Sequence, residues 1–321
     1  MPTPARVRVR SFAKINLDLR VLNKRPDGYH ELRTIFQTVS LADTLDVEYA
    51  RGRTRIDIKS DLNIPGNIIE KAAHLVLETT RRCGRVGFVL QKNIPLGGGL
   101  GGGSSNAASV LLALPPLIGK PLPLPKLIEL AAGLGSDVPF FLLGGTALGL
   151  GRGTELYPLP DHPPRPALIV CPEIHSSTAE AYAALGRKES PAPSPEILNN
   201  FQQLVWTRSR SFANDFEPVV FRLHPQLKSI QRKLLQIGAA EARMSGSGSS
   251  IFGIFEDRAL RDRAAEVFRS EPGNSAPKNS PRLRVYPVTM VSRSRYHALW
   301  RRQLAAFGDS TLWPPHDRYA K

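Results

Sequence analysis

Six glycines within seven positions, residues 97–103, constrain this chain more than any other feature of its sequence. They lie between a predicted strand, 86–91, and a predicted helix, 104–114. Glycine allows left-handed backbone conformations and lets N–H groups approach a ligand without a Cβ in the way. At a helix N-terminus, such N–H groups and the positive end of the helix dipole favour phosphate oxygens. A flexible linker has a similar composition, but a linker does not usually run straight into good helix formers such as NAASVLLAL. The segment therefore predicts a phosphate-binding loop.

Familiar nucleotide-binding motifs do not account for this loop. A GxGxxG spacing is present, but no acidic residue follows about 20 positions later, where a dinucleotide-binding fold needs a partner for the ribose. The glycine spacing of a P-loop is also present, but Ser104 occupies the lysine position. The protein-kinase motifs HRD and DFG do not occur. These three classes of nucleotide-binding protein are therefore excluded.

Length and charge limit the choice of partners. The chain has 321 residues, 41% of them hydrophobic, which is enough for about two domains with real cores. Its 43 lysines and arginines against 28 aspartates and glutamates give a formal charge of +15. Such an excess suits nucleic acid, anionic lipid or phosphorylated small molecules, and charge alone does not choose among them. The densest basic stretch, residues 282–302, contains no acid and is interpreted as a surface feature.

Cysteine content and hydropathy predict a protein of the cytoplasm. The two cysteines, Cys83 and Cys171, are too few for a disulfide framework and lack metal-ligand spacing. The first residues are charged but are not followed by the apolar stretch of a signal peptide. Proline or glycine interrupts the longest apolar runs, 107–118 and 138–150, before they reach the roughly 18 residues of a membrane span. We expect a soluble protein without a membrane partner.

The pattern of apolar residues indicates an α+β protein. Asn67 followed by Glu70 resembles a capping box and predicts the start of a helix. Strands and helices mix in both halves without a sustained βαβ rhythm. The predicted strands, besides 86–91, lie at 6–10, 15–21, 34–40, 44–49, 54–59, 167–171 and 251–255, and the predicted helices, besides 104–114, at 68–82, 125–135 and 217–237.

A proline-rich segment divides the chain in two. Residues 157–166 contain five prolines, which disfavour both helix interiors and strand pairing. We place the domain boundary there. The predicted domains are residues 1–160 and 161–305, followed by a flexible tail at 306–321.

Three segments resemble the motifs of the GHMP kinase superfamily, which includes galactokinase, homoserine kinase and mevalonate kinase. They read AKINL at 13–17, PLGGGLGGGSSNAA at 95–108 and MSGSGSS at 244–250. The resemblance implies a two-domain GHMP kinase fold, with a ribosomal-protein-like N-terminal domain and a ferredoxin-like C-terminal domain. It also implies an ATP-dependent kinase that uses Mg²⁺. MSGSGSS is expected beside the phosphate loop, and a plain tight turn before Ile251 is the alternative.

Three further segments resemble one type of GHMP kinase, whose acceptor is a cytidine diphosphate-linked methylerythritol. They read RPDGYHEL at 25–32, LGSDVPFFL at 134–142 and ANDFEPVVF at 213–221. The resemblance implies phosphorylation of the 2-hydroxyl of the methylerythritol moiety, in the non-mevalonate pathway to isoprenoid precursors. A GHMP kinase of the homoserine or mevalonate type is one alternative, and a basic RNA-binding protein is another. We expect no nucleic-acid partner, and a monomer or weak dimer.

The resemblance assigns the catalytic roles to two residues. Asp137 matches the catalytic aspartate, and Lys14 matches the lysine that pairs with it near the acceptor hydroxyl. Phosphoryl transfer needs a group that takes the hydroxyl proton and positive charge that stabilises the moving phosphoryl group. From the residues alone, Asp137 would serve equally well as a helix N-cap, and for Lys14 a plain lysine on a strand face is favoured.

The resemblance also places the ATP phosphates in the glycine-rich loop. In related superfamily members the second serine of this loop helps to hold Mg²⁺, which implies that role for Ser105. An ordinary helix cap formed by Ser104 or Ser105 is the alternative, and both roles can hold at once. The expected phosphate-binding residues are Pro95, Leu96, Gly97, Gly98, Gly99, Leu100, Gly101, Gly102, Gly103, Ser104 and Ser105.

Aromatic residues are expected to bind the cytosine of the acceptor. Tyr29 and His30 match the residues that stack on cytosine and hydrogen-bond to it, and Tyr182 matches the opposing aromatic. Stacking contributes about 1 to 3 kcal/mol per base in nucleic-acid binders, so such a clamp could dominate affinity. Asn16 matches a residue that contacts the methylerythritol end. The alternatives are a turn with Tyr29 in the core and a plain polar strand residue at Asn16.

Overall fold

The structure is a computed structural model that describes residues 5–161, 163–174, 176–187, 212–270 and 283–307. The predicted tail, from residue 308 onward, lies outside these residues. The strands are β1 (Ala5–Lys24), β2 (His30–Arg51), β3 (Arg55–Ser60), β4 (Gly84–Gln91), β5 (Thr146–Gly151), β6 (Glu155–Pro158), β7 (Pro166–Pro172), β8 (Glu241–Met244), β9 (Ile251–Ile254) and β10 (Leu283–Thr289). The helices are α1 (Ile68–Thr80), α2 (Gly102–Ile118), α3 (Leu124–Leu134), α4 (Phe140–Leu143), α5 (Thr178–Leu185), α7 (Glu217–Leu223), α8 (Pro225–Gln236), α9 (Arg258–Arg269), α11 (Arg293–Leu304) and η1 (Ala305–Phe307).

Two long strands form the backbone of the first sheet. β1 pairs with β2 along one edge, while the other edge of β2 pairs with β4 over its second half and with β5 over its first half. Sequence analysis divided each long strand into separate shorter strands, and this was wrong. Bulges between Phe12 and Ala13 and between Asn16 and Asp18 shift the register of β1 without ending it. The alternation of apolar residues is broken there, although the pairing continues.

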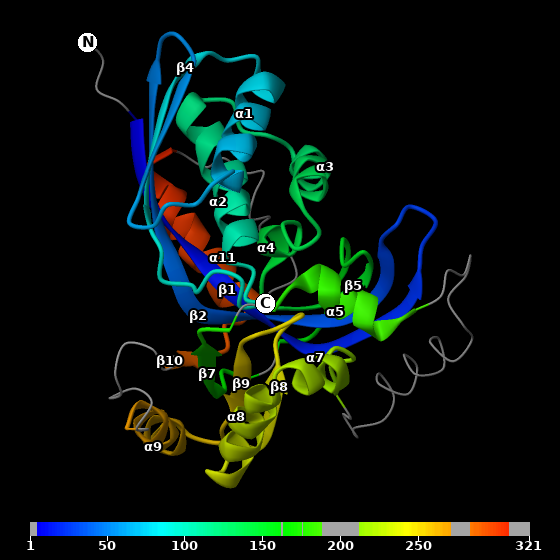
Figure 1. Ribbon diagram of the computed structural model, residues 1–321. Coiled ribbons are helices and arrows are strands. Elements are labelled where there is room, and N and C mark those ends of the chain that lie inside the picture. The colour runs from blue at the N-terminus through cyan, green and yellow to red at the C-terminus, as the bar shows by residue number, and fades with distance from the viewer. Residues whose placement is uncertain (1–4, 162, 175, 188–211, 271–282, 308–321) are drawn as a thin grey trace.

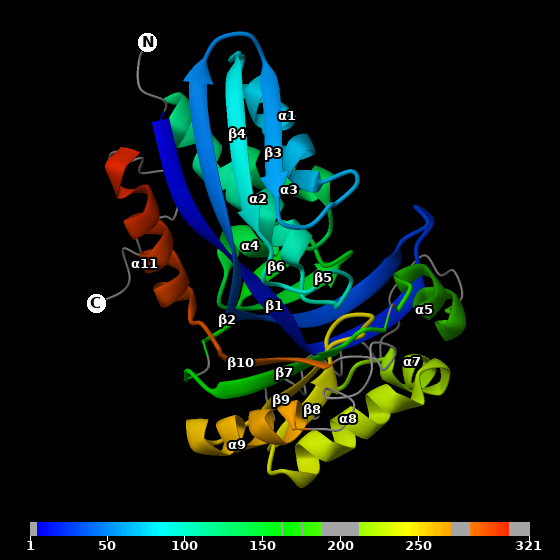
Figure 2. The same ribbon diagram turned by 60° about the vertical axis from the view of Figure 1, so that its left-hand side comes forward.

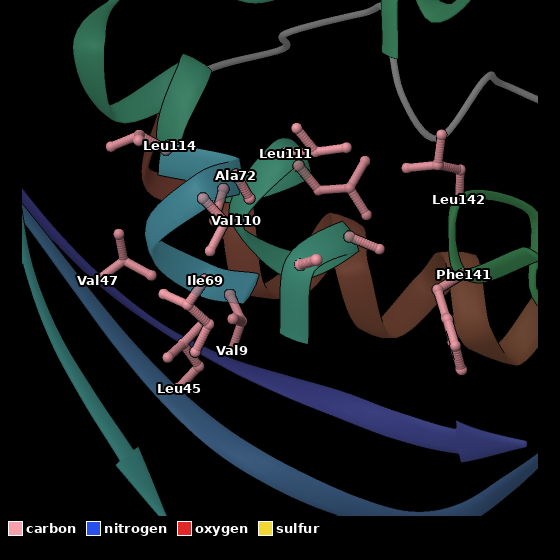
Figure 3. Packing of buried hydrophobic residues seen from close by; sticks show 14 of the residues in the cluster. Val9, Leu45, Val47, Ile69, Ala72, Val110, Leu111, Leu114, Phe141 and Leu142 are labelled. Carbon is pink, nitrogen blue, oxygen red and sulfur yellow. The ribbon is translucent and has the colours of Figure 1, made fainter. Parts of the chain in front are cut away.

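Helices α1 and α2 cover one face of the first sheet, and α3 packs against these two helices (Figure 1). The predicted cap of α1 is confirmed, because Asn67 Oδ1 accepts a hydrogen bond from Ile69 N. α2 runs past its predicted end at residue 114 to Gly119, whose N–H and that of Lys120 close the last turn on Pro116 O and Pro115 O. The prolines therefore lie in a capped last turn. Figure 3 shows side chains of both helices pointing toward those of β1 and β2, and this packing forms the first core.

The second sheet is smaller and antiparallel, with the strand order β10-β7-β9-β8. β7 lies inside this sheet and is buried along its whole length. Its alternate residues enter two different clusters: Leu168 and Val170 pack toward α7 and α8, while Ala167, Ile169 and Cys171 pack toward β1 and β2. A strand covered on both faces reads as a continuous apolar run, and β7 was predicted for this reason.

The last helix returns to the first core. α11 lies beside β1 in Figure 2, and its buried residues Tyr296, Trp300 and Leu304 join the first hydrophobic cluster. The basic stretch containing α11 was interpreted as a surface feature, which is wrong for Arg293, because its guanidinium donates to Thr146 O and Leu159 O. The predicted boundary at residue 160 stays a prediction, and α11 packs across it.

Sequence analysis did not name several elements of this mixed fold. They are α4, α5, α9, α11, β5, β6, β8 and β10. Within the described part of the chain, no helix combines the length and the apolar character that crossing a membrane would require.

Candidate active site

A cleft of about 880 Å³ lies where the two sheets meet. It brings together residues that are far apart in the sequence and that were predicted to share a site. Its lining includes Lys14, Asn16, Tyr29, His30, Gly97, Gly99, Gly101, Ser104, Asp137 and Tyr182 from the prediction, together with Thr34, Phe36, Arg152, Ser176, Ser177, Thr178 and residues 246–248.

The predicted phosphate loop forms one wall of the cleft and ends in α2. Gly101 is the N-cap of α2, and no side chain of the described structure caps this helix. The first N–H groups of α2 are therefore left to a ligand, in the positive field of the helix dipole. The alternative of a serine cap is wrong, since Ser104 and Ser105 lie within the first turn. Ser104 lines the cleft, whereas Ser105 is 1% exposed.

The segment MSGSGSS packs directly on the phosphate loop, as predicted. Ser245 Oγ donates to Gly99 O at 2.9 Å, and Ser250 N donates to Gly98 O at 3.3 Å. Ser245 Oγ also accepts from Asn16 N at 3.3 Å. One hydroxyl thus joins β1, the phosphate loop and the second sheet.

A buried ion pair supports the phosphate loop from below. Lys92 Nζ lies 2.7 Å from Asp43 Oδ2 and donates to Ile94 O, and both side chains are almost fully buried. Asp43 also accepts from Asn93 N, Ile94 N and Asn106 Nδ2. Burial lowers the pKa of Lys92, and the neighbouring Asp43 opposes this shift. The pair therefore fixes the turn that leads from β4 into the loop.

The predicted catalytic pair is in contact. Lys14 Nζ lies 3.1 Å from Asp137 Oδ2; the Lys14 side chain is 4% exposed and that of Asp137 33%. Asp137 lies in the turn before α4, whose N-cap is Pro139, so the alternative of a helix cap is wrong. The Lys14 ammonium also lies over the Phe36 ring, 5.3 Å from its centroid. The carboxylate faces the cleft, while the ammonium is held behind it.

A chain of hydrogen bonds continues from Lys14 along the strands. Lys14 Nζ donates to Asn16 Oδ1 at 2.7 Å, and Asn16 Nδ2 donates to Thr34 Oγ1 at 2.8 Å. Thr34 Oγ1 in turn donates to Asp18 O at 2.7 Å. All four residues are buried.

The three predicted acceptor-binding aromatics line the same cleft. Tyr29 is 51% exposed, so the alternative that placed it in the core is wrong. The guanidinium of Arg152 lies 4.5 Å from the centroid of the Tyr29 ring. His30 stacks on Tyr182 with ring centroids 4.5 Å apart, and Phe216 contacts Tyr182 edge to face.

Burial shifts the pKa of two of these rings. It lowers the pKa of His30, with a smaller contribution from the charge of Lys24. His30 is therefore neutral at neutral pH, with one nitrogen that donates and one that accepts. Burial also raises the pKa of Tyr182 to about 12, and the charge of Asp137 adds to this shift. Tyr182 is therefore an uncharged aromatic surface.

Sequence reasoning missed other residues of the cleft. Thr34 and Phe36 lie in a continuously buried part of β2, residues 33–39, and their residue types give no sign of a site. Arg152 follows Gly151 in a tight turn, where an arginine is ordinary. No group of three or more His, Cys, Asp or Glu in the described ranges could hold a metal ion.

Comparison with known proteins finds two family models on this chain. The model of the GHMP kinases N terminal domain matches residues 67–145, and that of the GHMP kinases C terminal matches residues 195–274. A 4-diphosphocytidyl-2-C-methyl-D-erythritol kinase from Solibacter usitatus is 49% identical, over 99% of both chains. The kinase of the same description from Thermus thermophilus is 41% identical, over 80% of this chain and 91% of its own.

Solved structures agree with these relatives. The structure of a 4-(cytidine 5'-diphospho)-2C-methyl-D-erythritol kinase is 35% identical and superposes with a TM-score of 0.70, covering 89% of this chain and 100% of that one. A homoserine kinase from Cytophaga hutchinsonii, 19% identical, has a TM-score of 0.64 over 91% of this chain and 96% of its own. The second likeness concerns the fold alone.

Proposed function

The chain belongs to the GHMP kinases and, within them, to the family of 4-diphosphocytidyl-2-C-methyl-D-erythritol kinases, and from this premise we infer that it transfers the terminal phosphoryl group of ATP to the 2-hydroxyl of 4-diphosphocytidyl-2-C-methyl-D-erythritol. The reaction belongs to the non-mevalonate pathway to isoprenoid precursors. The observation that carries this function is the contact of Lys14 with Asp137 in one cleft with the phosphate loop.

The geometry supports separate places in the cleft for the ATP phosphates, for the reacting groups and for the cytidine end of the substrate. The phosphates of ATP lie on the N–H groups of the loop and of the first turn of α2. The hydroxyl of Ser105, or that of Ser104 on the cleft wall, would help to hold Mg²⁺ beside the nucleotide phosphates, and the bound ion would supply positive charge against theirs. Serine hydroxyls suit this ion, because Mg²⁺ prefers oxygen ligands and keeps most of its contacts to phosphate and water.

Asp137 takes the proton of the acceptor hydroxyl as that oxygen bonds to the terminal phosphorus. The bond from this phosphorus to the bridging oxygen breaks, and ADP leaves. The Lys14 ammonium has three N–H groups, and in the described structure two of them are taken by hydrogen-bond partners, Asn16 Oδ1 and Asp137 Oδ2. The third N–H group can donate to the substrate hydroxyl oxygen as negative charge develops on it.

The cytidine end of the acceptor lies among Tyr29, His30 and Tyr182. The neutral His30 ring can both donate to and accept from the edge of cytosine. His30 covers one face of the Tyr182 ring, so a base that stacks on that face must displace His30. Asn16 lies between this pocket and the reacting hydroxyl.

The setting of the enzyme belongs to the same proposal. Both cysteines are free, Cys83 exposed and Cys171 buried, in keeping with a reducing cytoplasm. We place the reaction there, with the protein as a monomer or weak dimer and with domains that divide near residue 160.

A direct assay tests the function. The purified chain is incubated with ATP, Mg²⁺ and the cytidylyl substrate, and phosphorylated product is measured beside parallel reactions with homoserine and mevalonate. We expect product only from the cytidylyl substrate. Equal turnover of homoserine or mevalonate would contradict the proposed acceptor.

Replacement of Asp137 tests the mechanism. Asp137→Asn keeps the size of the side chain but removes the proton acceptor, so kcat should fall by about 10²- to 10⁴-fold. Asp161→Asn, outside the cleft lining, is the control for the loss of a negative charge. A kcat near that of the unchanged protein would remove Asp137 from the role of base.

A further inference from the structure

We propose that Thr34 is a positioning residue, which fixes the orientation of the Asn16 amide and through it the Lys14 ammonium. The inference rests on the proposed function and adds a residue that touches neither Lys14 nor Asp137. It starts from the hydrogen-bond chain that joins Asp18 O, Thr34, Asn16 and Lys14.

The Asp18 end of this series of hydrogen bonds fixes the direction in which each bond is donated. A backbone carbonyl can only accept, so the contact of 2.7 Å between Thr34 Oγ1 and Asp18 O uses the one hydroxyl hydrogen of Thr34. Thr34 Oγ1 can then only accept from Asn16, 2.8 Å away. The Asn16 group that faces Thr34 is therefore the NH₂.

The second end requires the same direction. An ammonium can only donate, so the Asn16 atom 2.7 Å from Lys14 Nζ must be the carbonyl oxygen. A reversed amide would place its NH₂ against the ammonium and its oxygen against a hydroxyl whose hydrogen is already used. Thr34 thus selects the amide orientation that Lys14 needs.

Burial makes this selection matter. Thr34 is 1% exposed, Asn16 2% and Lys14 3%, so water has little room to replace a lost partner. Without the Thr34 hydroxyl, the buried NH₂ of Asn16 has no acceptor and the amide turns to find one. The Lys14 ammonium would then leave its place 3.1 Å from Asp137.

Isosteric substitutions test the proposal. Thr34→Val removes the hydroxyl and should lower kcat about 10-fold with KM for ATP within twofold, because a small misplacement of a reacting group is costly. Thr34→Ser keeps the hydroxyl and should restore kcat to within about threefold.

The control is Thr38→Val, on the same strand. Thr38 is fully buried, and its hydroxyl finds no hydrogen-bond partner in the part of the chain that the structure describes. This variant should keep kcat. If Thr34→Val retains full kcat, or if Thr34→Ser loses as much as Thr34→Val, the proposal is wrong.

A double-mutant cycle separates positioning from general structure. If Thr34 acts through Asn16, then adding Thr34→Val to Asn16→Ala should lower kcat by less than about twofold more. Independent, multiplicative losses would overturn the proposal. Should Thr34→Val fail to fold, Thr34→Cys replaces it in the cycle, since a thiol is a weak acceptor of similar size.

A measurement that does not depend on catalytic activity separates this inference from the proposed function. In protein labelled with ¹⁵N-lysine, the Lys14 ammonium signal, assigned by its loss in Lys14→Arg, should broaden or vanish in Thr34→Val and persist in Thr38→Val. An unchanged signal in Thr34→Val would overturn the inference. Absence of turnover in the unchanged protein would instead overturn the proposed function and leave this measurement intact.

Discussion

Gly99 is confined by the second sheet. Its φ of +74° lies in the left-handed region, and a methyl group there would overlap the carbonyl group of Ser245. The same residue offers its own carbonyl oxygen to the Ser245 hydroxyl. Gly99 therefore allows two distant segments to approach closely enough to form one wall of the cleft.

Gly99→Ala should separate these segments. A strained alanine of this kind costs on the order of 1 to 3 kcal/mol, so the Tm should fall by about 3 to 10 °C. Affinity for ATP should fall as well, measured by nucleotide titration. Gly103→Ala is the control for stability, because Gly103 is helical and a methyl group there meets only Ile68, at 3.9 Å. Equal loss of stability in both variants would contradict this reading of Gly99.

Motifs predicted the cleft residues that lie in recognisable segments, and missed Thr34 and Arg152, which lie outside those segments. Lys14 and Asp137 lie in recognisable segments, and the structure places them 3.1 Å apart. Thr34 looks like any strand threonine, because its importance depends on two partners that only the strand pairing brings near. The role of such a residue follows from contacts and not from its type.

At the scale of elements, the short segment before α7, which contains Asn214, connects the second sheet to the first. Asn214 pairs with Leu19 of β1 through a parallel bridge, and its Nδ2 donates to Met244 O and Gly246 O. Glu217, in the first turn of α7, accepts from Met244 N at 2.8 Å. The segment therefore fixes the start of the loop that packs on Gly99.

Glu217 makes this connection sensitive to pH. Burial raises the pKa of its carboxyl, against its hydrogen bonds and the charge of Arg243. At a pH just above the ordinary glutamate pKa of 4.5, the folded protein therefore binds more protons than the unfolded chain. The protonated Glu217 then adds to the stability of the fold, and this contribution is lost as pH rises through the pKa of the folded protein.

Glu217→Gln should remove this dependence, because the amide oxygen still accepts from Met244 N but does not titrate. The free energy of unfolding, measured with urea between pH 4.5 and 7.5, should fall less with rising pH in Glu217→Gln than in the unchanged protein. Glu266→Gln, at an exposed position of α9, should not change the slope. A larger fall in Glu217→Gln would contradict the assignment.

Elements with a clear period or cap could be predicted, and those defined by tertiary pairing could not. α1 has its cap and apolar stripe, and β7 is a continuous apolar run. β10 carries Arg284 and Pro287 and pairs with β7 at the edge of the sheet, where its own sequence gives little sign of a strand. α11 is rich in arginine, and its apolar side is visible only once the first core is known.

On the scale of the whole molecule, apolar residues of both sheets pack together in one hydrophobic cluster. A cluster that includes Ile15 and Ile35 of the first sheet and Ile169 and Phe252 of the second lies between them. α11 then crosses back, where Tyr296 donates to Phe141 O at 2.6 Å, just after the turn that carries Asp137. The turn that carries Asp137 is therefore supported from both parts of the chain.

Trp300→Ala should show how much the first core depends on α11. Trp300 is 1% exposed, and its loss should cost about 3 to 5 kcal/mol in the free energy of unfolding. Arg301→Ala, on the exposed side of the same helix, should change it by less than about 0.5 kcal/mol. A similar small effect of both would mean that α11 contributes little to the core.

The return of α11 also sets an order for folding during synthesis. The first core has received its earlier members once Ala147 is made, yet Leu304 completes it. At about 5 to 20 residues per second, the roughly 150 residues between them take on the order of ten to thirty seconds to make. Throughout that time the nascent chain exposes the apolar surface that α11 will cover. The first half of the chain therefore emerges with apolar surface of the kind that chaperones bind, and the turn that carries Asp137 gains its contact with Tyr296 only after α11 has been made.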